Sequence, residues 1–310
     1  MKYSYVIPCY NSALTIETVV DQINLKMKEM NETSYEIILV NDYSKDNTKE
    51  VIFNLANKHK NVIAITMSKN FGQHAALLAG YNNVSGEYVI SLDDDGQTPP
   101  SEVDKLINKL QEGHDVVFAN YKVKHHSTFR NIGSKLNDYM ATKLIQKPKG
   151  LYLSSFHIAR RYVIDEVIKY KGPFPYISGL ILRVTVSTVN VDVEHKDRDT
   201  GNSGYNIYSL FKLWLNGFTA FSIKPLRVSM YIGGMVAVFG FLAAFYSVVN
   251  KLLNTDTPVG WSSLIAITAI VGGTILVMLG VIGEYIGRIY LSLNHDPQYI
   301  IKEIKGKNNE

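Results

Sequence analysis

Two long stretches near the carboxyl end of this 310-residue chain contain no charged residue. They run from Val228 to Asn250 and from Thr257 to Gly283, and a short polar link separates them. At about 1.5 Å of rise per residue, either stretch can cross a hydrocarbon core of about 30 Å as a helix. We therefore expect two membrane-spanning helices, at about 228–250 and 259–283, that form a hairpin. A hairpin buried in the core of a soluble protein is the alternative.

Basic residues flank the predicted hairpin on both outer sides. Lys224 and Arg227 precede the first stretch, and the cations that follow the second are Arg288, Lys302, Lys305 and Lys307. Because Lys and Arg gather in cytoplasmic segments of membrane proteins, both ends of the hairpin are expected in the cytosol. The amino terminus enters a strand-like run without the apolar core of a signal peptide. The part of the chain before the hairpin is therefore also expected to stay in the cytosol.

The first 120 residues alternate strand-like and helix-like patterns. The strand-like runs are Tyr3–Ile7, Tyr35–Val40, Val62–Thr66, Tyr88–Leu92 and Asp115–Ala119, and the helical ones are Ala13–Met30, Asn47–Asn57, Gln73–Asn82 and Ser101–Gln111. This alternation predicts an α/β domain with a mostly parallel sheet and helices on both faces. The net charge of +4 is too small to favour a nucleic-acid partner, and the single cysteine, Cys9, excludes a disulfide framework.

Three consecutive carboxylates follow one of the predicted strands. Asp93, Asp94 and Asp95 come directly after the apolar run 88–92, and Gly96 with two later prolines prevents the strand from continuing. Adjacent carboxylates repel one another unless a cation lies between them. Oxygen ligands in such a turn suit Mg²⁺ or Mn²⁺, which take part of their coordination shell from substrate phosphates. A solvated acidic turn is the alternative.

Polar residues also follow the other predicted strands. Because parallel strands present their carboxyl ends at one edge of a sheet, these residues are expected to lie near the three acids. Asp42 could accept the imide N–H of a uracil on which Tyr10 stacks, and Lys69 could offset phosphate charge. Gly72 would let the backbone approach a ligand closely. Alternatively, Asp42 is only a turn residue and Lys69 only a surface lysine. The sequence contains neither a GxGxxG motif nor a P-loop motif, so it does not support a dinucleotide-binding or P-loop fold.

Five segments together resemble family 2 glycosyltransferases. They are 6–11, 40–46, 69–80, 93–100 and 283–290. More closely, they are similar to the polyprenyl-phosphate glycosyltransferases, a group that includes the GtrB-like bactoprenol glucosyltransferases, the undecaprenyl-phosphate formamido-arabinose transferases and dolichyl-phosphate mannose synthase. The resemblance covers nearly the whole chain, and the ordered set is more specific than any one of its motifs.

The resemblance implies a GT-A fold and a donor site at the acidic turn. By that resemblance the donor-binding residues are Pro8, Tyr10, Asn11, Asp42, Lys69, Gly72, Asp93 and Asp94. The divalent ion, Mg²⁺ or Mn²⁺, would be held by Asp95 and Gln97 with support from Asp93. Two positions depart from the family pattern, because Asp94 stands where a small residue is usual and Gly96 where Leu is usual. Both departures bear on the geometry of the metal site.

The acceptor side is also assigned by resemblance. Arg130, Ser134, Arg198 and Ser203 would hold the acceptor phosphate, and Asp93, Asp95, Arg130 and Arg198 form the expected catalytic set. The alternatives are an exposed helix cation for Arg130 and a flexible polar loop around Arg198. An Asp proposed as a base in some members is Ser155 here, the Arg that follows it is His157, and a loop Lys is Gly204.

The missing Asp need not prevent the reaction. A phosphate monoester has a second pKa near 6, so the acceptor is largely dianionic at neutral pH and needs little deprotonation. Two unit charges about 4 Å apart repel by roughly 4 kcal/mol at an effective dielectric of about 20. Charge neutralisation by a metal ion and by Arg or Lys is therefore the stronger requirement.

The sequence thus predicts four regions. They are a cytosolic GT-A domain over 1–204, an amphipathic interfacial helix over 205–226, two transmembrane helices within 227–288, and a cytosolic tail over 289–310. The expected activity is inverting transfer of a sugar from a nucleotide sugar, most simply a UDP-sugar, to undecaprenyl phosphate. It would take place at the cytoplasmic face of a bacterial inner membrane and serve surface polysaccharide modification. The resemblance also implies a homo-oligomer, namely a tetramer.

Two other functions remain open at this point. One is a family 2 transferase with a different lipid or glycan acceptor. The other is a catalytically idle scaffold in the membrane that still binds nucleotides, which the departures at Ser155 and Gly204 would favour.

Overall fold

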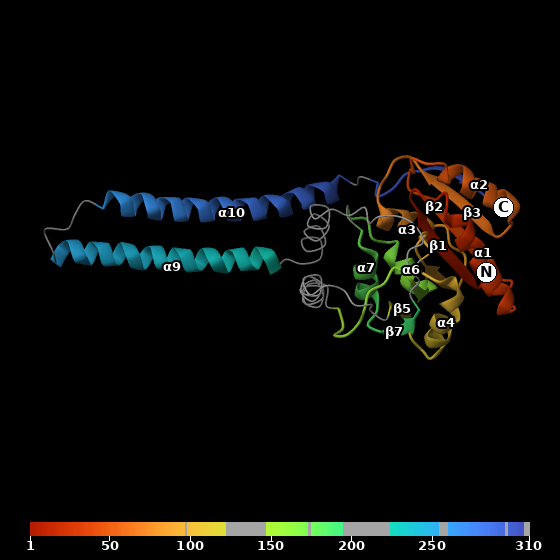
Figure 1. Cartoon of the computed structure of the whole chain (residues 1–310). Coiled ribbons are helices and arrows are strands. Elements are labelled where there is room, and N and C mark those ends of the chain that lie inside the picture. The colour runs from red at the N-terminus through yellow and green to blue at the C-terminus, as the bar shows by residue number, and fades with distance from the viewer. Residues whose placement is uncertain are drawn as a thin grey trace. The chain divides into compact units, whose positions relative to one another are not determined.

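The computed structural model divides the chain into two compact units (Figure 1). It describes residues 1–96, 98–121, 147–172, 175–194, 224–253, 260–294 and 297–306. The first unit comprises residues 1–210 together with 295–310, and the second comprises residues 211–294. Within the described residues, the first unit is an α/β domain and the second is a helical hairpin.

The α/β domain is built on an eight-stranded sheet with the order β7-β5-β6-β4-β1-β2-β3-β8. The strands are β1 (Tyr3–Cys9), β2 (Tyr35–Asn41), β3 (Val62–Met67), β4 (Tyr88–Ser91), β5 (Val116–Tyr121), β6 (His157–Arg160), β7 (Thr188–Val193) and β8 (Ile301–Lys305). Strands β6 and β8 run antiparallel to their neighbours, and the other pairs are parallel. The predicted α/β class with a mostly parallel sheet is confirmed.

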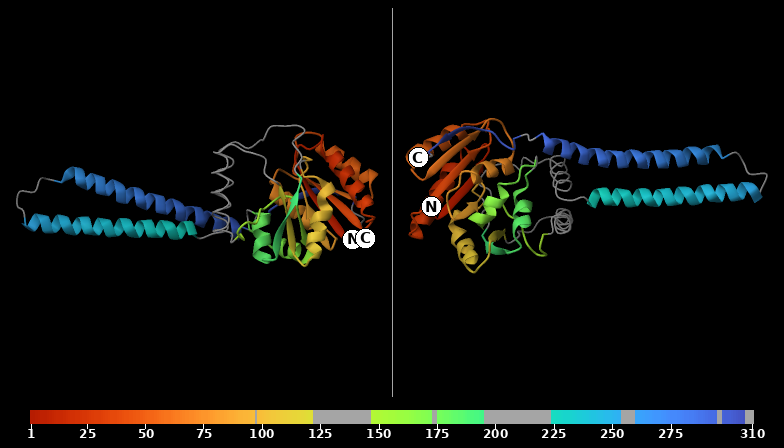
Figure 2. Two further views of the ribbon diagram at one scale, coloured as in Figure 1. Left: turned by 60° about the horizontal axis from the view of Figure 1, so that its bottom comes forward. Right: turned by 180° about the vertical axis from the view of Figure 1, so that it is seen from behind.

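The helices of this domain lie on both faces of the sheet (Figure 1, Figure 2). They are α1 (Ile16–Glu29), α2 (Thr48–Lys58), α3 (Gln73–Tyr81), the 3-10 turn η1 (Pro100–Glu102), α4 (Val103–Gln111), α6 (Arg161–Val167) and α7 (Ile177–Val184). The expected helices and strands of residues 1–120 are all present, with ends that differ by a few residues.

Alternating side chains of the central strands supply the core. Ile7 and Leu39 point to one face, where they pack in one cluster with buried residues of α1, α2 and α4. Val6 and Val40 point to the other face, because successive strand residues alternate. There α3 approaches so closely that a Cβ at Gly80 would clash with Val6 Cγ1. Helix α3 is therefore fixed against β1 and β2, and its first turn lies at the carboxyl ends of these strands.

The chain returns to the sheet after the hairpin. Strand β8 pairs antiparallel with β3, and Glu303 of β8 forms an ion pair with Lys49 of α2 at 2.8 Å. In Figure 2, β8 is the blue strand beside the orange β3. The sequence analysis treated 289–310 as a tail and did not predict this strand. Segments before and after the hairpin thus belong to the same folded unit.

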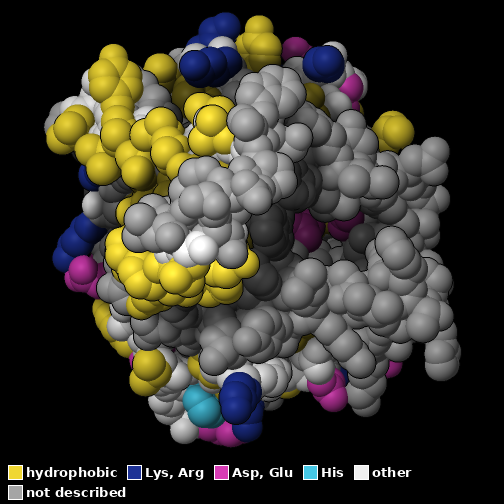
Figure 3. All heavy atoms as spheres, turned by 90° about the vertical axis from the view of Figure 1, so that its left-hand side faces the viewer, with side chains coloured by type: hydrophobic (Ala, Val, Ile, Leu, Met, Phe, Trp, Pro, Cys, Tyr) yellow, Lys and Arg dark blue, Asp and Glu magenta, His cyan; other side chains and the backbone are white. Residues whose placement is uncertain are grey.

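The second unit contains helices α9 (Lys224–Leu253) and α10 (Trp261–Leu293). Both helices are longer than the predicted spans. Large apolar side chains such as Phe241 and Leu276 are exposed on them, and Figure 3 shows exposed hydrophobic side chains gathered on one face of the molecule. Met278 of α10 packs against Gly233 of α9, where a Cβ would clash with its side chain. Among the described residues, one segment, 270–287, is long and apolar enough to cross a membrane, and α9 has a shorter apolar segment at 229–243.

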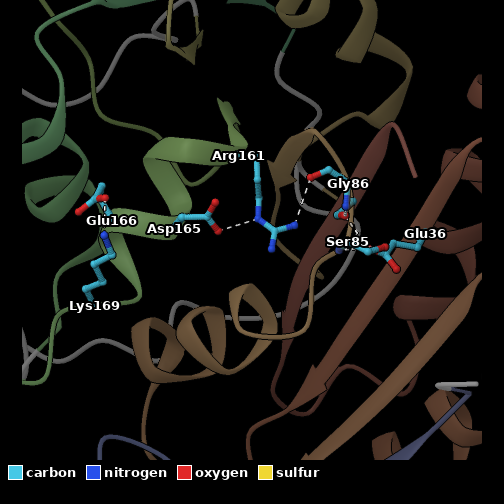
Figure 4. Close-up of polar contacts among 8 residues, drawn as sticks. Glu36, Ser85, Gly86, Arg161, Asp165, Glu166 and Lys169 are labelled. Carbon is cyan, nitrogen blue, oxygen red and sulfur yellow. Dashed lines mark hydrogen bonds and ion pairs between the residues drawn. The ribbon is translucent and has the colours of Figure 1, made fainter. Parts of the chain in front are cut away.

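A buried carboxylate ties the amino ends of the central strands together (Figure 4). Glu36 of β2 is 5% exposed, and its Oε1 accepts hydrogen bonds from the Ser4 hydroxyl at 2.6 Å and from the Ser85 amide at 2.6 Å. The Gly86 amide donates to Ser4 Oγ at 2.8 Å. Arg161, at the start of α6, donates to the Gly86 carbonyl and to Asp165. The network joins β1, β2 and the loop before β4.

We predict that Glu36→Ala destabilises the domain, because Ser4 and Ser85 lose their buried acceptor. The loss should be about 2 kcal/mol or more, which lowers Tm by roughly 4–8 °C for a domain of this size. The measurement is thermal unfolding of the full chain in detergent. Glu166→Ala is the control, since its ion pair with Lys169 is exposed and contributes less than about 1 kcal/mol. Equal melting of the two variants would contradict the prediction.

Candidate active site

The strand order fixes the order of polar segments along the carboxyl edge of the sheet. The segment 68–72 follows β3, Asp42 follows β2, Tyr10 follows β1 and the three acids follow β4. Because β4, β1, β2 and β3 are adjacent and parallel, these segments meet at one edge. The expectation that they converge is therefore confirmed.

Asp42 holds the turn that opens α3. Its Oδ1 accepts the Phe71 amide at 2.7 Å, and its Oδ2 accepts the Gly72 amide at 2.8 Å. Burial raises the pKa of Asp42, and the two amide donors act in the opposite direction. Gly72 has φ +91°, a conformation in which a Cβ would be strained. Each carboxylate oxygen can accept a second hydrogen bond, so a role for Asp42 toward a nucleobase stays a prediction.

The turn after β1 presents Tyr10, and Asn11 makes hydrogen bonds to the loop after β2. Tyr10 is 46% exposed, as a stacking residue must be, whereas Pro8 is buried within β1. Asn11 has φ +56°, its amide donates to Ser44 Oγ at 3.0 Å, and its Oδ1 accepts the Lys45 amide at 2.9 Å. In this structure the side chain of Asn11 therefore holds the turn. Lys69 is exposed, with its ammonium 5.0 Å from the Phe71 ring centre.

Asp94 faces the loop after β1. Its Oδ2 accepts the Tyr10 amide at 3.1 Å and the Ser12 hydroxyl at a short distance. Burial is the main cause that raises the pKa of Asp94, and the two donors favour its charged form. Asp94 thus connects the end of β4 to the end of β1 and sets the position of Tyr10. The sequence analysis placed it among donor-binding residues, and the structure shows how it could act through the Tyr10 loop.

Asp93 is the most strongly perturbed acid of the turn. Its Oδ1 accepts a hydrogen bond from Gln73 Nε2 at 2.8 Å, and its Oδ2 accepts one from Ser155 Oγ at 2.5 Å. Burial, with added repulsion from Asp95 and Asp94, raises the pKa of Asp93 to about 6. Three adjacent carboxylates, of which Asp93 and Asp94 are desolvated, are an arrangement that a bound cation stabilises.

The donor set of the turn fits a divalent ion that arrives with a diphosphate. Among the described residues, no three His, Cys, Asp or Glu side chains form a group that could hold an ion by themselves. Asp93 and Asp95 supply hard oxygen donors, and Mg²⁺ is commonly held by one or two carboxylates together with substrate phosphates. The third predicted ligand, Gln97, lies outside the residues that the structure describes.

Ser155 reaches the acids because β6 is antiparallel. Strand β6 pairs with β4 so that His157 lies opposite Ser91, and the residues before β6 therefore lie beside the residues after β4. Ser155 takes the place of the Asp expected from the resemblance and donates to Asp93. A serine there cannot add a fourth negative charge to the turn.

His157 lies in the core and is not placed to exchange protons with a substrate. It is 2% exposed, its Nδ1 lies 3.0 Å from the Ser155 carbonyl, and its Nε2 lies 3.3 Å from the Tyr81 hydroxyl. Burial lowers the pKa of His157 to about 4, so its ring is neutral at physiological pH. Cys9 is likewise buried and free, as expected for a small core residue.

The acceptor-side predictions cannot be placed. Arg130, Ser134, Arg198 and Ser203 lie outside the described residues, and so do 205–223 of the predicted interfacial helix. The sequence analysis gave no role to Gln73, which donates to Asp93, or to Tyr121, Tyr152 and Asn190, which contact one another at the same sheet edge. Tyr121 ends β5 at the same edge, so the rule that located the acids could have located it.

Comparison with known proteins decides the family. Residues 4–168, more than half of the chain, match glycosyl transferase family 2, and residues 224–289 match the GtrB C-terminal hairpin. This chain belongs to glycosyltransferase family 2. The resemblance on which the sequence analysis relied is confirmed, and the chain is a glycosyltransferase with a GT-A-like domain.

Two curated relatives align with nearly the whole of this glycosyltransferase, and one solved structure resembles the fold of the larger part of it. An undecaprenyl-phosphate 4-deoxy-4-formamido-L-arabinose transferase of Photorhabdus laumondii is 33% identical over 99% of this chain and 95% of the relative. A protein of the same name from Proteus mirabilis is 34% identical over 98% and 94%. The crystal structure of glucosyl-3-phosphoglycerate synthase from Mycobacterium tuberculosis with Mn²⁺, UDP-glucose and phosphoglyceric acid superposes with a TM-score of 0.53. It covers 70% of this chain and 77% of that one at 18% identity, a likeness of fold.

We predict that Asp94→Ala raises KM for the nucleotide-sugar donor about tenfold, because the Tyr10 loop loses a charged acceptor. Asp94→Asn retains a carbonyl oxygen for the same donors and should stay within about threefold of the wild type. Steady-state kinetics with varied donor would measure both. If Asp94→Asn were as impaired as Asp94→Ala, the charge of Asp94 and not its loop contact would be what matters.

We predict that His157 contributes to loss of stability in acid. The unfolded chain binds a proton on this residue below pH about 6.5, whereas the folded chain does so only below about 4. Stability should therefore fall between these two pH values, by up to about 3 kcal/mol. The measurement is thermal unfolding at pH 7.5 and pH 5, with His157→Asn showing a smaller shift in Tm. Equal shifts in both proteins would contradict the buried neutral ring.

Proposed function

We propose that this glycosyltransferase moves one sugar from a nucleotide sugar, most simply a UDP-sugar, to undecaprenyl phosphate, with inversion at the anomeric carbon. The observation that carries the proposal is the convergence of Tyr10, Asp42 and the acidic turn at one sheet edge, in a chain that also has a GtrB-type hairpin. The names of the curated relatives support undecaprenyl phosphate as the acceptor.

The donor would lie along the sheet edge. A base would occupy the side of β1 and β2, against Tyr10 and near Asp42, and the diphosphate would lie at the end of β4. Asp93 and Asp95, together with Gln97, would hold Mg²⁺ or Mn²⁺, which stabilises charge on the departing diphosphate. The synthase of Mycobacterium tuberculosis was crystallised in complex with Mn²⁺ and UDP-glucose, which supports this choice of donor and ion.

An oxygen of the lipid phosphate would attack the anomeric carbon. The new bond joins that oxygen to the sugar, and the bond between the sugar and the nucleoside diphosphate breaks. A phosphate monoester is largely dianionic above a pKa near 6, so no side chain has to remove its proton. This agrees with a serine at position 155 and a buried, neutral His157.

Cations must bring the two anionic substrates together. Like charges about 4 Å apart repel by roughly 4 kcal/mol at an effective dielectric of about 20. We assign this task to Arg130 and Arg198, with Ser134 and Ser203 as hydrogen-bond donors to the acceptor phosphate.

The hairpin would anchor the enzyme in the cytoplasmic membrane. Helices α9 and α10 expose apolar side chains along their length, as lipid-facing helices do. Residues before and after the hairpin belong to one folded unit, so two spans would keep that unit in the cytosol. Residues 205–226 would lie at the membrane interface, and the lipid product would serve modification of a surface polysaccharide. Assembly as a homo-oligomer, namely a tetramer, belongs to the same proposal.

The deciding experiment incubates the purified full chain with a short polyprenyl phosphate and a panel of UDP- and GDP-sugars. We predict one lipid-linked sugar by mass analysis, with product lost on chelation and restored by Mg²⁺ or Mn²⁺. Asp95→Asn should lower transfer by about a hundredfold or more, because electrostatic stabilisation of the leaving group is lost. Asp165→Asn, on the surface of α6, is the control.

Absence of product with every donor would overturn the proposed acceptor or activity. Full transfer in the presence of chelator would overturn only the role of the metal ion.

A further inference from the structure

Two tyrosines lie beyond the acids along the sheet edge, on the side away from Tyr10 and Asp42. Along the sheet edge, β2 and β1 lie on one side of β4, and β6 and β5 lie on the other. Tyr121 ends β5, and Tyr152 belongs to the segment that leads into β6. The strand order therefore places Tyr10, the acidic turn and this pair of tyrosines in sequence along one edge.

The two rings are in contact, and Tyr121 lies close enough to Asp93 and Asp95 to be affected by their charges. Their centroids are 6.4 Å apart and their planes meet at 84°, an edge-to-face arrangement. Burial raises the pKa of Tyr121, and the charges of Asp93 and Asp95 raise it further. Tyr121 is half-buried, whereas Tyr152 is 47% exposed. Tyr121 thus supports one side of an aromatic ring that faces solvent beside the acidic turn.

The backbone of Tyr152 is held by two hydrogen bonds with the side chain of Asn190 of β7. Asn190 Oδ1 accepts the Tyr152 amide at 2.7 Å, and Asn190 Nδ2 donates to the Tyr152 carbonyl at 2.8 Å. The same Nδ2 also lies 3.2 Å from the Phe118 carbonyl, which ties the contact to β5. The side-chain amide reproduces the two hydrogen bonds of a neighbouring strand. The exposed ring therefore projects from a fixed backbone, which favours a binding surface over a loose loop.

We propose that Tyr152, supported by Tyr121, forms the wall of the pocket for the transferred sugar, and that Asn190 is its positioning residue. The inference rests on the proposed function, because that function orients the donor. With the base beside β1 and β2 and the diphosphate at the acids, the sugar extends toward β6 and β5. The C–H face of a pyranose ring packs on an aromatic face, as apolar groups do, and its hydroxyls remain free for polar contacts.

The test compares binding of UDP with binding of UDP-sugars, since only the latter carry the group that the wall would contact. The probes are UDP and the UDP-sugar of the panel that the wild type binds most tightly, measured by calorimetry on the full chain in detergent. Tyr152→Ala should weaken UDP-sugar binding about tenfold and leave UDP binding within about twofold. Tyr152→Phe should restore the wild-type ratio, and Asn190→Ala should show a loss in the same direction.

Tyr162→Ala is the matched control, because Tyr162 is also 47% exposed but belongs to α6. If Tyr152→Ala leaves the ratio of UDP to UDP-sugar affinity unchanged, as Tyr162→Ala should, the wall does not contact the sugar. If Tyr152→Ala instead raises only KM for polyprenyl phosphate, the ring serves the acceptor and the proposal is overturned. A wild type that binds the donor and transfers sugar keeps the proposed function in either case, whereas one that binds neither UDP nor any donor refutes both.

Discussion

The crowding of three carboxylates at the end of β4 is the constraint on which the site depends. Desolvation makes the negative charges of Asp93 and Asp94 costly, and repulsion between adjacent carboxylates adds to that cost. In the fold, Asp93 and Asp94 point to different hydrogen-bond partners instead of sharing one buried position. Asp94 is directed to the loop after β1, and Asp93 is held by Gln73 from α3 and Ser155 from the segment before β6. Four different segments are thereby fixed around the place where a cation and a diphosphate would bind.

The same interactions connect the acidic turn to the core of the domain. Gln73 lies in the first turn of α3, and that turn is set by the hydrogen bonds of Asp42 to Phe71 and Gly72. The close approach of α3 at Gly80 fixes the helix against β1 and β2. A change in the packing of this helix would therefore shift the carboxylate of Asp93 through its hydrogen bond with Gln73.

Local sequence patterns were sufficient to predict the parallel core and the strand ends that carry the acids, but not the contacts made by strands β6 and β8. Alternating runs of strand and helix gave the parallel core, and the rule for strand ends placed Tyr10, Asp42 and the acids at one edge. The inserted antiparallel β6 and the returning β8 depend on pairing between distant segments, which short windows do not encode. Hence the contact of Ser155 with Asp93, and the clamp of Asn190 on Tyr152, could not be predicted from spacing.

Two of the departures from the family pattern, Asp94 and Ser155, have opposite effects on the negative charge at the acidic turn. By the resemblance, a small residue is usual between the two acids of the turn, and some members have an Asp at the position of Ser155, which gives those members three carboxylates. This chain has Asp94 in the turn and a serine at 155, and the number of carboxylates is again three. A fourth would face Asp93, whose pKa is already raised to about 6 by burial and by its neighbours. The Ser155 hydroxyl donates a hydrogen bond to Asp93 and so stabilises its negative charge, whereas an Asp at position 155 would add a further negative charge. The carboxylate that Asp94 adds within the turn is thus balanced by the carboxylate that is absent at position 155.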